Sequence, residues 1–321
     1  MTSPPIVQIY ENWSFLAAFL IAVVSACAGP APPSVDAYVD TAAAVDAPVT
    51  PAGCAPPNPA VVAGKFAAPD LTELSGLVAS LAQPAVLWTH NDSDSQPRLF
   101  AVDTQAQLRA VVLVLGASVT DWEDIAIGPA ADATGSYLYI GDIGDNQQQR
   151  SRVHVWRVKE PTLPNSTAAV VLTSDPAGKL VFDYPDGNHD AEALACDPPT
   201  GDLWLATKVK DGKTKVYRAA APFSVGAIQV LQKVTALQWP GDPAVTGAAV
   251  AADGSLFILR TKTAARAWRR PASAGIAEAL LGEPCPLPVP SAPQGEGIAW
   301  TSQGYFTVGE AAGGDLGFVG W

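Results

Sequence analysis

The sequence predicts an all-β fold, a β-propeller of five or six antiparallel four-stranded blades, and three observations support this. A phrase of a polar residue, a small residue, an aliphatic residue and then Ala or Val occurs five times, starting at Ser75, Glu123, Glu192, Thr246 and Glu296. Each copy is followed by a turn rich in Gly, Asp, Pro or Ser and by a second apolar run. No long segment with helical periodicity follows residue 60. Repeats of about 50 residues built from β-hairpins are typical of a propeller.

The chain begins with a segment that we expect to be a signal peptide, residues 1–26. Ser14 to Ala26 is an apolar run of 13 residues, too short to span a membrane and suited to a signal-peptide core. It leads into Cys27 through Val24-Ser25-Ala26, which resembles the lipobox of bacterial lipoproteins, where the cysteine is lipidated. Residues 1–13 contain no Lys or Arg, so a buried hydrophobic segment is the alternative.

Residues 27–59 are expected to form a tether between this signal and the folded domain. They consist mainly of Ala, Pro and Asp, and such a composition cannot bury enough apolar surface to offset the entropy of ordering. The expectation is an extracytoplasmic protein whose lipidated Cys27 anchors it to a membrane of the bacterial cell envelope. The propeller domain then spans residues 60–321.

The charge and the cysteines narrow the choice of partners and of compartment. The formal net charge is −12, which disfavours nucleic acid as a partner because phosphate binding relies on clustered Lys and Arg. With Cys27 lipidated, three cysteines remain, and an oxidising compartment favours one disulfide. Cys54 precedes the propeller and Cys285 lies in the loop before the last repeat, so we predict that these two pair. Cys196 is expected to be a buried free thiol.

The strands of each unit follow in order along the chain. The phrase itself is the first strand, and the apolar run after the turn is the second. Expected third strands are 153–158, 215–218 and 267–270, and expected fourth strands are 108–115, 179–184 and 228–234. The last unit ends after two or three strands, so residues 60–68 are expected to complete it. The interval of 69 residues between Glu123 and Glu192 leaves room for a sixth blade around residues 166–184, and a two-sheet sandwich is the rival fold.

The repeats also predict where a site would lie. The first strand of each blade lines the central channel, so the starting positions of the five phrases should face one another. The second strand runs back to the same rim, and polar residues stand at or just after its end: Asn91, Asp92, Asp142, Asp145, Asn146, Lys208, Arg260 and Glu310.

Three carboxylates in one channel, those of Glu123, Glu192 and Glu296, repel one another. They either hold a cation, pair with Lys208 or Arg260, or become protonated. Calcium is the expected divalent cation because it takes six to eight oxygen ligands in loose geometry. The segment 141–146 offers further ligands in Asp142, Asp145 and Asn146, with turn capping as the alternative.

Other polar residues near this rim are candidates for ligand binding or for proton transfer. Lys208 and Arg260, with Asn91 and Asp92, could bind an anionic ligand, or the two cations could simply balance the glutamates. His90 and His189 are candidate general bases, with ordinary loop histidines as the alternative. His154 alternates with two valines on a third strand and is expected to be structural.

The glutamate phrases, Asp121 to Ala126, Asp190 to Ala195 and Gln294 to Ala299, resemble the inner-strand motif of secreted bacterial β-propellers. They are similar to those of esterase-like phytase-type and gluconolactonase/regucalcin-type propellers. This resemblance implies that Glu123, Glu192 and Glu296 are central cation ligands, and it supplies no catalytic acid or base. Two functions follow as hypotheses: a tethered propeller that binds a cation and a small molecule or protein at the rim, or a metal-dependent hydrolase of an ester, lactone or phosphoester at the same place.

Overall fold

The computed structural model describes residues 54, 58–92, 96–130, 134–166, 168–210, 213–239, 241 and 244–321. The expected signal peptide, Cys27 and most of the expected tether lie outside these residues. Among the described helices, none is long and apolar enough to cross a membrane.

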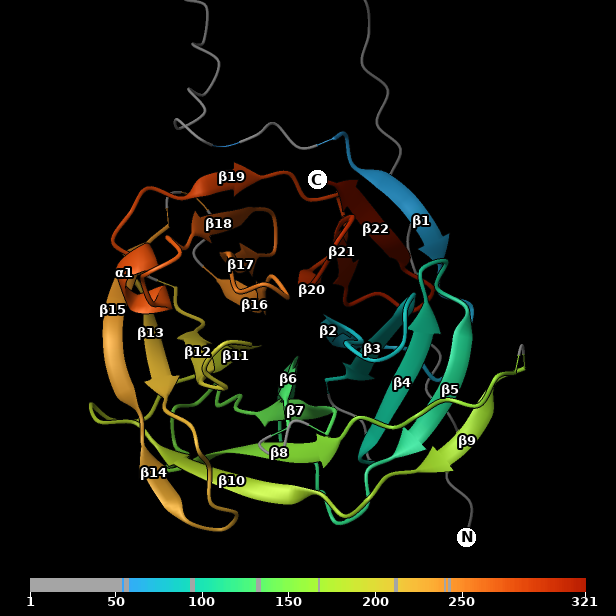
Figure 1. Cartoon of the computed structure of the whole chain (residues 1–321), viewed down its shortest axis with the longest axis horizontal. Helices are drawn as coiled ribbons and strands as arrows, with labels where there is room; N and C mark the ends of the chain where they lie inside the picture. Colours follow the sequence, from blue (N-terminus) through green and yellow to red (C-terminus); the bar gives the residue numbers. More distant parts are fainter. Residues whose placement is uncertain are drawn as a thin grey trace, which may run out of the picture. The chain divides into compact units, whose positions relative to one another are not determined.

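The described residues form five β-sheets arranged around a central channel (Figure 1). Each sheet is a blade with four antiparallel strands at its core, as the repeats predict. The first three blades, from the channel outward, are β2 (Leu74–Ala79), β3 (Val86–Asn91), β4 (Arg98–Asp103) and β5 (Leu108–Leu113); β6 (Trp122–Pro129), β7 (Ser136–Asp142), β8 (Val153–Lys159) and β10 (Gly178–Asp183); and β11 (Ala191–Cys196), β12 (Leu203–Thr207), β13 (Lys213–Ala219) and β15 (Gln232–Gln238).

The other two blades complete the ring. The fourth is β16 (Val245–Val250), β17 (Leu256–Thr261), β18 (Ala265–Arg269) and β19 (Cys285–Leu287), and the fifth is β20 (Gly295–Thr301), β21 (Gly304–Gly309), β22 (Asp315–Gly320) and β1 (Val61–Lys65). One short helix, α1 (Ile276–Ala279), lies between β18 and β19 and buries Ile276 and Ala279 against the core between the third and fourth blades.

The long second interval does not contain a sixth blade, so the six-blade alternative is wrong. Its residues form β9 (Val170–Thr173), which adds in parallel to the outer edge of β5, and β10, the fourth strand of the second blade. The expected single strand over 228–234 is also wrong. It divides into two strands because the chain passes here from the second blade to the third. β14 (Ile228–Val230) pairs with β10, and β15 pairs with β13. Leu231, between them, is buried and donates its N–H to the carbonyl of Asp183.

The fifth blade is closed by the N-terminal strand, as the sequence predicts. β1 pairs antiparallel with β22, with Val61 opposite Phe318 and Lys65 opposite Asp315. A disulfide joins Cys54 to Cys285, the predicted pair, with their Cα atoms 5.5 Å apart. Cys196 is buried and free. The closure therefore places residues at both ends of the domain side by side.

The second slot of the recurrent phrase is small because neighbouring inner strands approach closely there. A Cβ added to Gly76 would lie 2.5 Å from the backbone nitrogen of Ile125, and one added to Gly297 would lie 2.6 Å from the carbonyl oxygen of Ser75. A Cβ at Gly247 would lie 2.6 Å from the carbonyl oxygen of Glu296. The phrase is thus the sequence signature of a tight inner ring.

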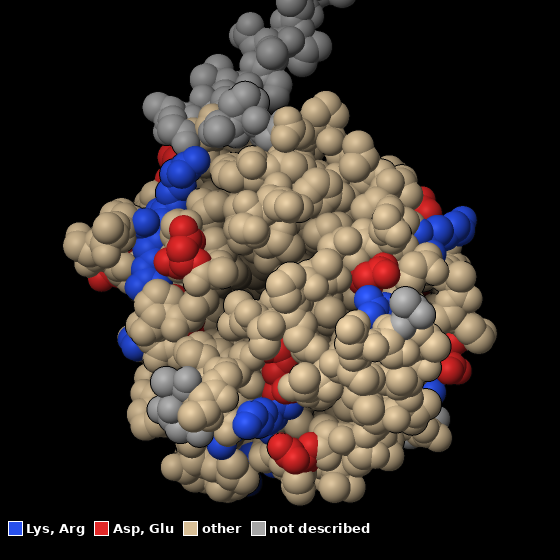
Figure 2. All heavy atoms as spheres, turned by 45° about the vertical axis from the view of Figure 1, so that its right-hand side comes forward, with Lys and Arg blue, Asp and Glu red and all other residues tan. Residues whose placement is uncertain are grey.

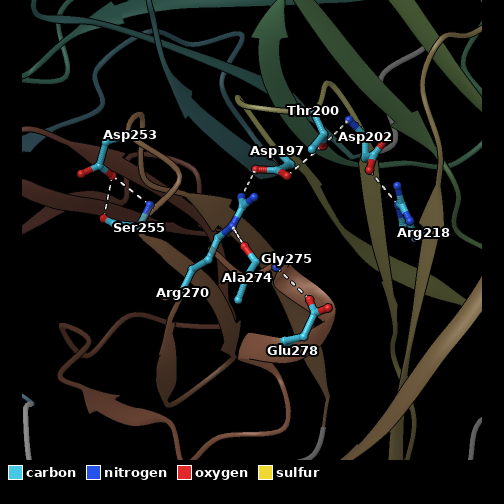
Figure 3. Close-up of polar contacts among 10 residues, drawn as sticks. All are labelled: Asp197, Thr200, Asp202, Arg218, Asp253, Ser255, Arg270, Ala274, Gly275 and Glu278. Carbon is cyan, nitrogen blue, oxygen red and sulfur yellow. Dashed lines mark hydrogen bonds and ion pairs between the residues drawn. The ribbon is translucent and has the colours of Figure 1, made fainter. Parts of the chain in front are cut away.

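Polar contacts also hold neighbouring blades together on the face where the first two strands of each blade turn (Figure 3). Arg270, which follows β18, donates to Asp197 of the third blade at 2.7 Å and to the carbonyl of Ala274 at 2.7 Å. Arg218 pairs with Asp202 at 2.7 Å within the third blade. The Asp197–Arg270 pair is largely buried on both sides, so losing one partner would leave an uncompensated charge.

The surface charges are mixed. On the face that Figure 2 shows, uncharged residues cover most of the surface, and lysine and arginine side chains lie in small groups, several of them beside aspartate or glutamate.

Candidate metal centre at the channel rim

The first strands of the five blades begin at one end of the channel, and a cavity of about 160 Å³ lies there. It brings together four of the five phrase positions, Ser75, Glu123, Glu192 and Glu296, with residues that follow the second strands. The full lining is Ser75, Asp92, Glu123, Asn146, Glu192, Lys208, Lys262, Gln294, Glu296 and Glu310. Sequence positions more than 200 residues apart therefore meet in one acidic cavity.

Two groups of three carboxylates meet at this rim and share one member. Asp92, Asp121 and Glu123 form the first group, and Glu123, Asp190 and Glu192 form the second. In each group the possible ligand atoms all lie within 4.8 Å of one another. The shared position of Glu123 joins the first, second and third blades in one cluster, which we call the rim cluster.

Asp121 and Asp190 were not among the ligands expected from the sequence. A signal for them exists, because each stands two residues before a glutamate of the phrase, as Asp121-Trp122-Glu123 and Asp190-Ala191-Glu192. Side chains two residues apart on an extended chain point to the same side. The alternation therefore marks both aspartates as neighbours of the glutamates.

Burial and mutual repulsion raise the pKa values of these carboxyl groups. The pKa of Glu192 rises to about 7, chiefly through burial, although Lys208 opposes the rise through an ion pair. Burial, with the charge of Glu192 second, raises the pKa of Glu296 to about 8. Burial and then Glu192 raise the pKa of Glu123 well above its usual value, and burial and then Asp121 raise that of Asp92 to about 6. The rim holds more negative charge than its lysines balance.

Two carboxylate oxygens at or beside the rim are buried without a protein partner. The Oδ1 atom of Asp92 accepts no hydrogen bond from the described residues. Within the same part of the chain, the Oδ2 atom of Asp142 accepts none either. Unpaired oxygens on crowded carboxylates are the donor set that a hard cation requires.

The backbone of the segment that follows β7 lies directly against the rim cluster. A Cβ added to Gly144 would lie 2.1 Å from Oε1 of Glu123 and 2.5 Å from Oδ2 of Asp121. The amide of Gly144 also donates to the carbonyl of Asp121 at 3.3 Å. Only glycine leaves these two carboxylates in their observed positions.

The expected ligands Asp142 and Asp145 have protein partners within the turn after β7. Asp142 pairs with Arg150 at 2.8 Å and accepts the amide of Asp121 at 3.2 Å. Asp145 accepts the amides of Gln149 and Arg150, and its own amide donates to Asp190 at 2.8 Å. Both act as the turn caps of the alternative interpretation and position Asp121 and Asp190, whereas Asn146 lines the cavity.

Arg260 and Asn91 also lie apart from the cavity lining, unlike Lys208 and Asp92. Arg260 is fully buried between the fourth and fifth blades, where Nη1 donates to the carbonyls of Gly297 at 2.9 Å and Val308 at 3.0 Å. Asn91 donates to the carbonyl of Asp70 at 2.7 Å and holds the loop before β2. The cation that reaches the cavity from the fourth blade is Lys262, two residues beyond Arg260.

Neither histidine expected near the rim lines the cavity. His90 is fully buried, its Nδ1 lies 3.0 Å from the carbonyl oxygen of Asn91, and burial lowers its pKa to about 4. The ring stands edge-on to Trp122. His189 has its Nε2 atom 3.0 Å from Asp186 and 3.2 Å from Lys215. Both histidines therefore lie outside the cavity lining, with the Nε2 atom of His90 buried without a partner among the described residues.

The sequence matches no family model and no curated protein. Solved structures with a similar arrangement include the PQQ-bound form of an aldose sugar dehydrogenase from Streptomyces coelicolor, with 12% identity, a TM-score of 0.45 and coverage of 83% of this chain and 99% of that one. Two structures described as glucose dehydrogenase share 11% and 10% identity, with TM-scores of 0.46 and 0.47, and each match covers 82% of this chain and 99% of the other. Likenesses of this degree say nothing about what this chain binds.

Proposed function

We propose that this chain is a cation-binding β-propeller whose rim cluster holds a divalent cation, calcium. The observation that supports the proposal is the pair of carboxylate triads that share Glu123. The orphaned Oδ1 of Asp92 and the close approach of Gly144 are independent signs that the oxygens are arranged for something other than protein partners.

Calcium fits this donor set better than a softer or smaller ion. Carboxylate and amide oxygens with no sulfur and no imidazole are the ligands of hard cations, and calcium tolerates irregular geometry and high coordination number. Asp92, Asp121, Glu123, Asp190 and Glu192 would supply the carboxylates, with Glu296 and Asn146 at the same cavity. A bound dication would offset the repulsion that raises their pKa values.

The lysines of the rim suggest the chemistry of a ligand. Lys208 and Lys262 line the same cavity as the carboxylates, so an anionic group could contact a lysine and the cation together. A cavity of about 160 Å³ admits a carboxylate or phosphate group rather than a large molecule. We propose that the rim binds an anionic group of a small molecule or of a protein side chain through the cation.

The tether gives the proposed setting. The apolar run 14–26, the lipobox-like residues before Cys27 and the Pro-rich segment after it support a domain held outside the cytoplasm on a lipid anchor. A disulfide between Cys54 and Cys285 fits an oxidising compartment.

The second candidate is a metal-dependent hydrolase of an ester, lactone or phosphoester. Because His90 and His189 lie outside the cavity lining, its general base would be a rim carboxylate, and Glu296, with a pKa of about 8, is suited to that role. Turnover of generic lactone or phosphoester substrates by the calcium-loaded chain, abolished in Glu192→Gln, would establish this reaction.

The direct test of the main proposal is calorimetric titration of the chain with calcium. We expect one high-affinity site, and we expect Glu123→Gln to weaken it at least about tenfold, or about 1.4 kcal/mol, because Glu123 belongs to both triads. Glu283→Gln removes an equal charge from an exposed position and should leave the affinity unchanged. Equal affinities in the wild type and Glu123→Gln would refute the proposal.

A further inference from the structure

The opposite end of the channel holds a second and larger cavity, of about 520 Å³. Each inner strand begins at the rim and ends at this cavity, which is lined by the later residues of all five strands, among them Ile127, Cys196, Val250 and Trp300. Between the two cavities lies the fully buried Asp124, whose neighbours Glu123 and Ile125 face the rim and the second cavity respectively. We call this second space the apolar chamber.

The apolar chamber has no charged residue in its lining within the described part of the chain. This is unusual for a chain with a net charge of −12, and it contrasts with the rim, where seven of the lining groups are Asp, Glu or Lys. An uncharged, apolar wall does not compensate the desolvation of an ionised ligand. The ligand class that fits the wall is therefore uncharged.

The hollow follows from the fourth slot of the recurrent phrase. In four of the five blades this slot is alanine, and three of these alanines line the chamber, Ala126, Ala195 and Ala249. Leucine or phenylalanine at these positions would fill the axis, as side chains fill the interior of small barrels. The small residues leave a space within the range of small-molecule sites, which is roughly 300–1,000 Å³.

A few polar groups stand at the mouth. Ser302 and Gln303 belong to the turn between β20 and β21, and Thr104 follows β4 of the neighbouring first blade. An apolar body with a small number of hydroxyl or amide groups at its edge is the usual composition of a site that binds an uncharged organic molecule. Trp300 lines the same wall and packs against Trp321.

We propose that the apolar chamber binds one uncharged, mainly apolar small molecule, independently of the cation at the rim. The proposal rests on the volume, the uncharged lining and the alanines of the fourth slot. It needs no contribution from the rim cluster, so its success or failure is separate from that of the calcium site.

The test is titration of the full-length chain with N-phenyl-1-naphthylamine, an uncharged probe that fluoresces in apolar surroundings. We expect saturable binding of one probe per chain, and at least about tenfold weaker binding in Ala249→Leu, because the added side chain occupies the chamber. Val171→Ser, which removes a side chain that is 83% exposed on β9, is the control and should bind as the wild type does. Loss of binding in Val171→Ser would show that the probe lies on an exposed apolar surface and would overturn the proposal.

A second measurement does not depend on the folding of a variant. Trp300 lines the chamber, so bound probe should quench part of the tryptophan fluorescence of the wild-type chain along the same titration curve as its own emission rises. Unchanged tryptophan fluorescence at saturating probe would overturn the proposal. So would probe binding that does not saturate, or an unchanged affinity in a folded Ala249→Leu.

Discussion

Backbone contacts from the turn after β7 fix the positions of several carboxylates of the rim cluster. Gly144 lies against Glu123 and Asp121, and the amides of Asp121 and Asp145 are tied to Asp142 and Asp190. The turn after β7 therefore works as a template that fixes the oxygens before any cation binds. Preorganised ligands lose little entropy on binding, which favours affinity.

The first prediction concerns this template. Gly144→Ala should lower calcium affinity at least about tenfold while leaving the fold intact, because the new methyl group must displace the side chains of Glu123 and Asp121. Calorimetry with calcium measures the effect. Gly282→Ala is the matched control, since its Cβ would lie 3.3 Å from the carbonyl oxygen of Ala279 at an exposed position, far from the rim, and needs only a small shift there. Equal affinities in the two variants would contradict the template.

The second prediction concerns pH. Glu192 and Glu296 have pKa values raised to about 7 and about 8, so between about pH 6.5 and about pH 8.5 the calcium-free folded state binds more protons than the unfolded state. Stability should therefore fall as pH rises through this window. His90, whose pKa is lowered by burial, is neutral in the folded state and still loses its proton in the unfolded state near pH 6.5, so it opposes the fall only at the acid end of the window. The thermal midpoint measured in EGTA should show the fall, and saturating calcium should reduce it.

The matched variant for this pH effect is the double substitution Glu192→Gln and Glu296→Gln. It removes these two titrating groups and should give a shallower slope of the thermal midpoint over the same pH range in EGTA, since Glu123, whose pKa is raised chiefly by burial, remains. A slope as steep as that of the wild type would show that the fall has another origin.

At the scale of the element, the inner strands form a ring joined by hydrogen bonds that cross between blades. Ser75 donates to the carbonyl of Glu123, and Thr246 donates to the carbonyl of Gly295 at 2.8 Å. The two phrase positions without glutamate therefore connect adjacent blades. Asp124, the one charged residue in the second slot, connects three blades, because its Oδ2 accepts the amides of Leu194 at 2.8 Å and Ala248 at 3.0 Å.

The third prediction follows from the position of Asp124. Asp124→Asn should lower the free energy of unfolding by roughly 2–4 kcal/mol, because both carboxylate oxygens accept backbone N–H groups and the amide –NH₂ would face at least one of these donors in a fully buried place. Urea denaturation measures the change. Asp253→Asn, at an exposed hairpin, should change it by less than about 1 kcal/mol. A similar loss in both variants would mean that Asp124 does not connect the blades.

At the scale of the molecule, the ring is closed by strands from both ends of the domain. β1 completes the fifth blade, and the Cys54–Cys285 disulfide links the segment before β1 to the fourth blade across a sequence separation of 231 residues. β1 covers the outer edge of β22. Loss of β1 would therefore leave the backbone groups of β22 exposed as a sheet edge.

The fourth prediction concerns this closure. The double variant Cys54→Ala and Cys285→Ala should lower the free energy of unfolding by roughly 2–5 kcal/mol, because the linkage restricts the unfolded chain over a long loop. Amide hydrogen exchange should also become faster in β1 and β22. Unchanged exchange in these two strands would show that pairing alone holds the closure.

Local patterns in the sequence were enough to predict the propeller, its inner strands, the closing strand and the disulfide pair. Each depends on a period or a position along the chain: apolar runs between glycine turns, and a last unit short of a strand. The rim was predictable for the same reason, because equivalent positions of a repeat face a common axis.

The depth of each side chain was decided only by the tertiary structure. Arg260 and Lys262 stand two residues apart on the fourth blade, yet Arg260 is buried between blades and Lys262 reaches the cavity. A register irregularity in the β16–β17 pairing, between Val245 and Gly247, lies opposite Arg260 and Thr261. Likewise, the sequence determined that glutamates and alanines recur on the inner strands. Only the packing of five blades around one axis decided that the glutamates crowd within reach of one cation and that the alanines leave an open chamber.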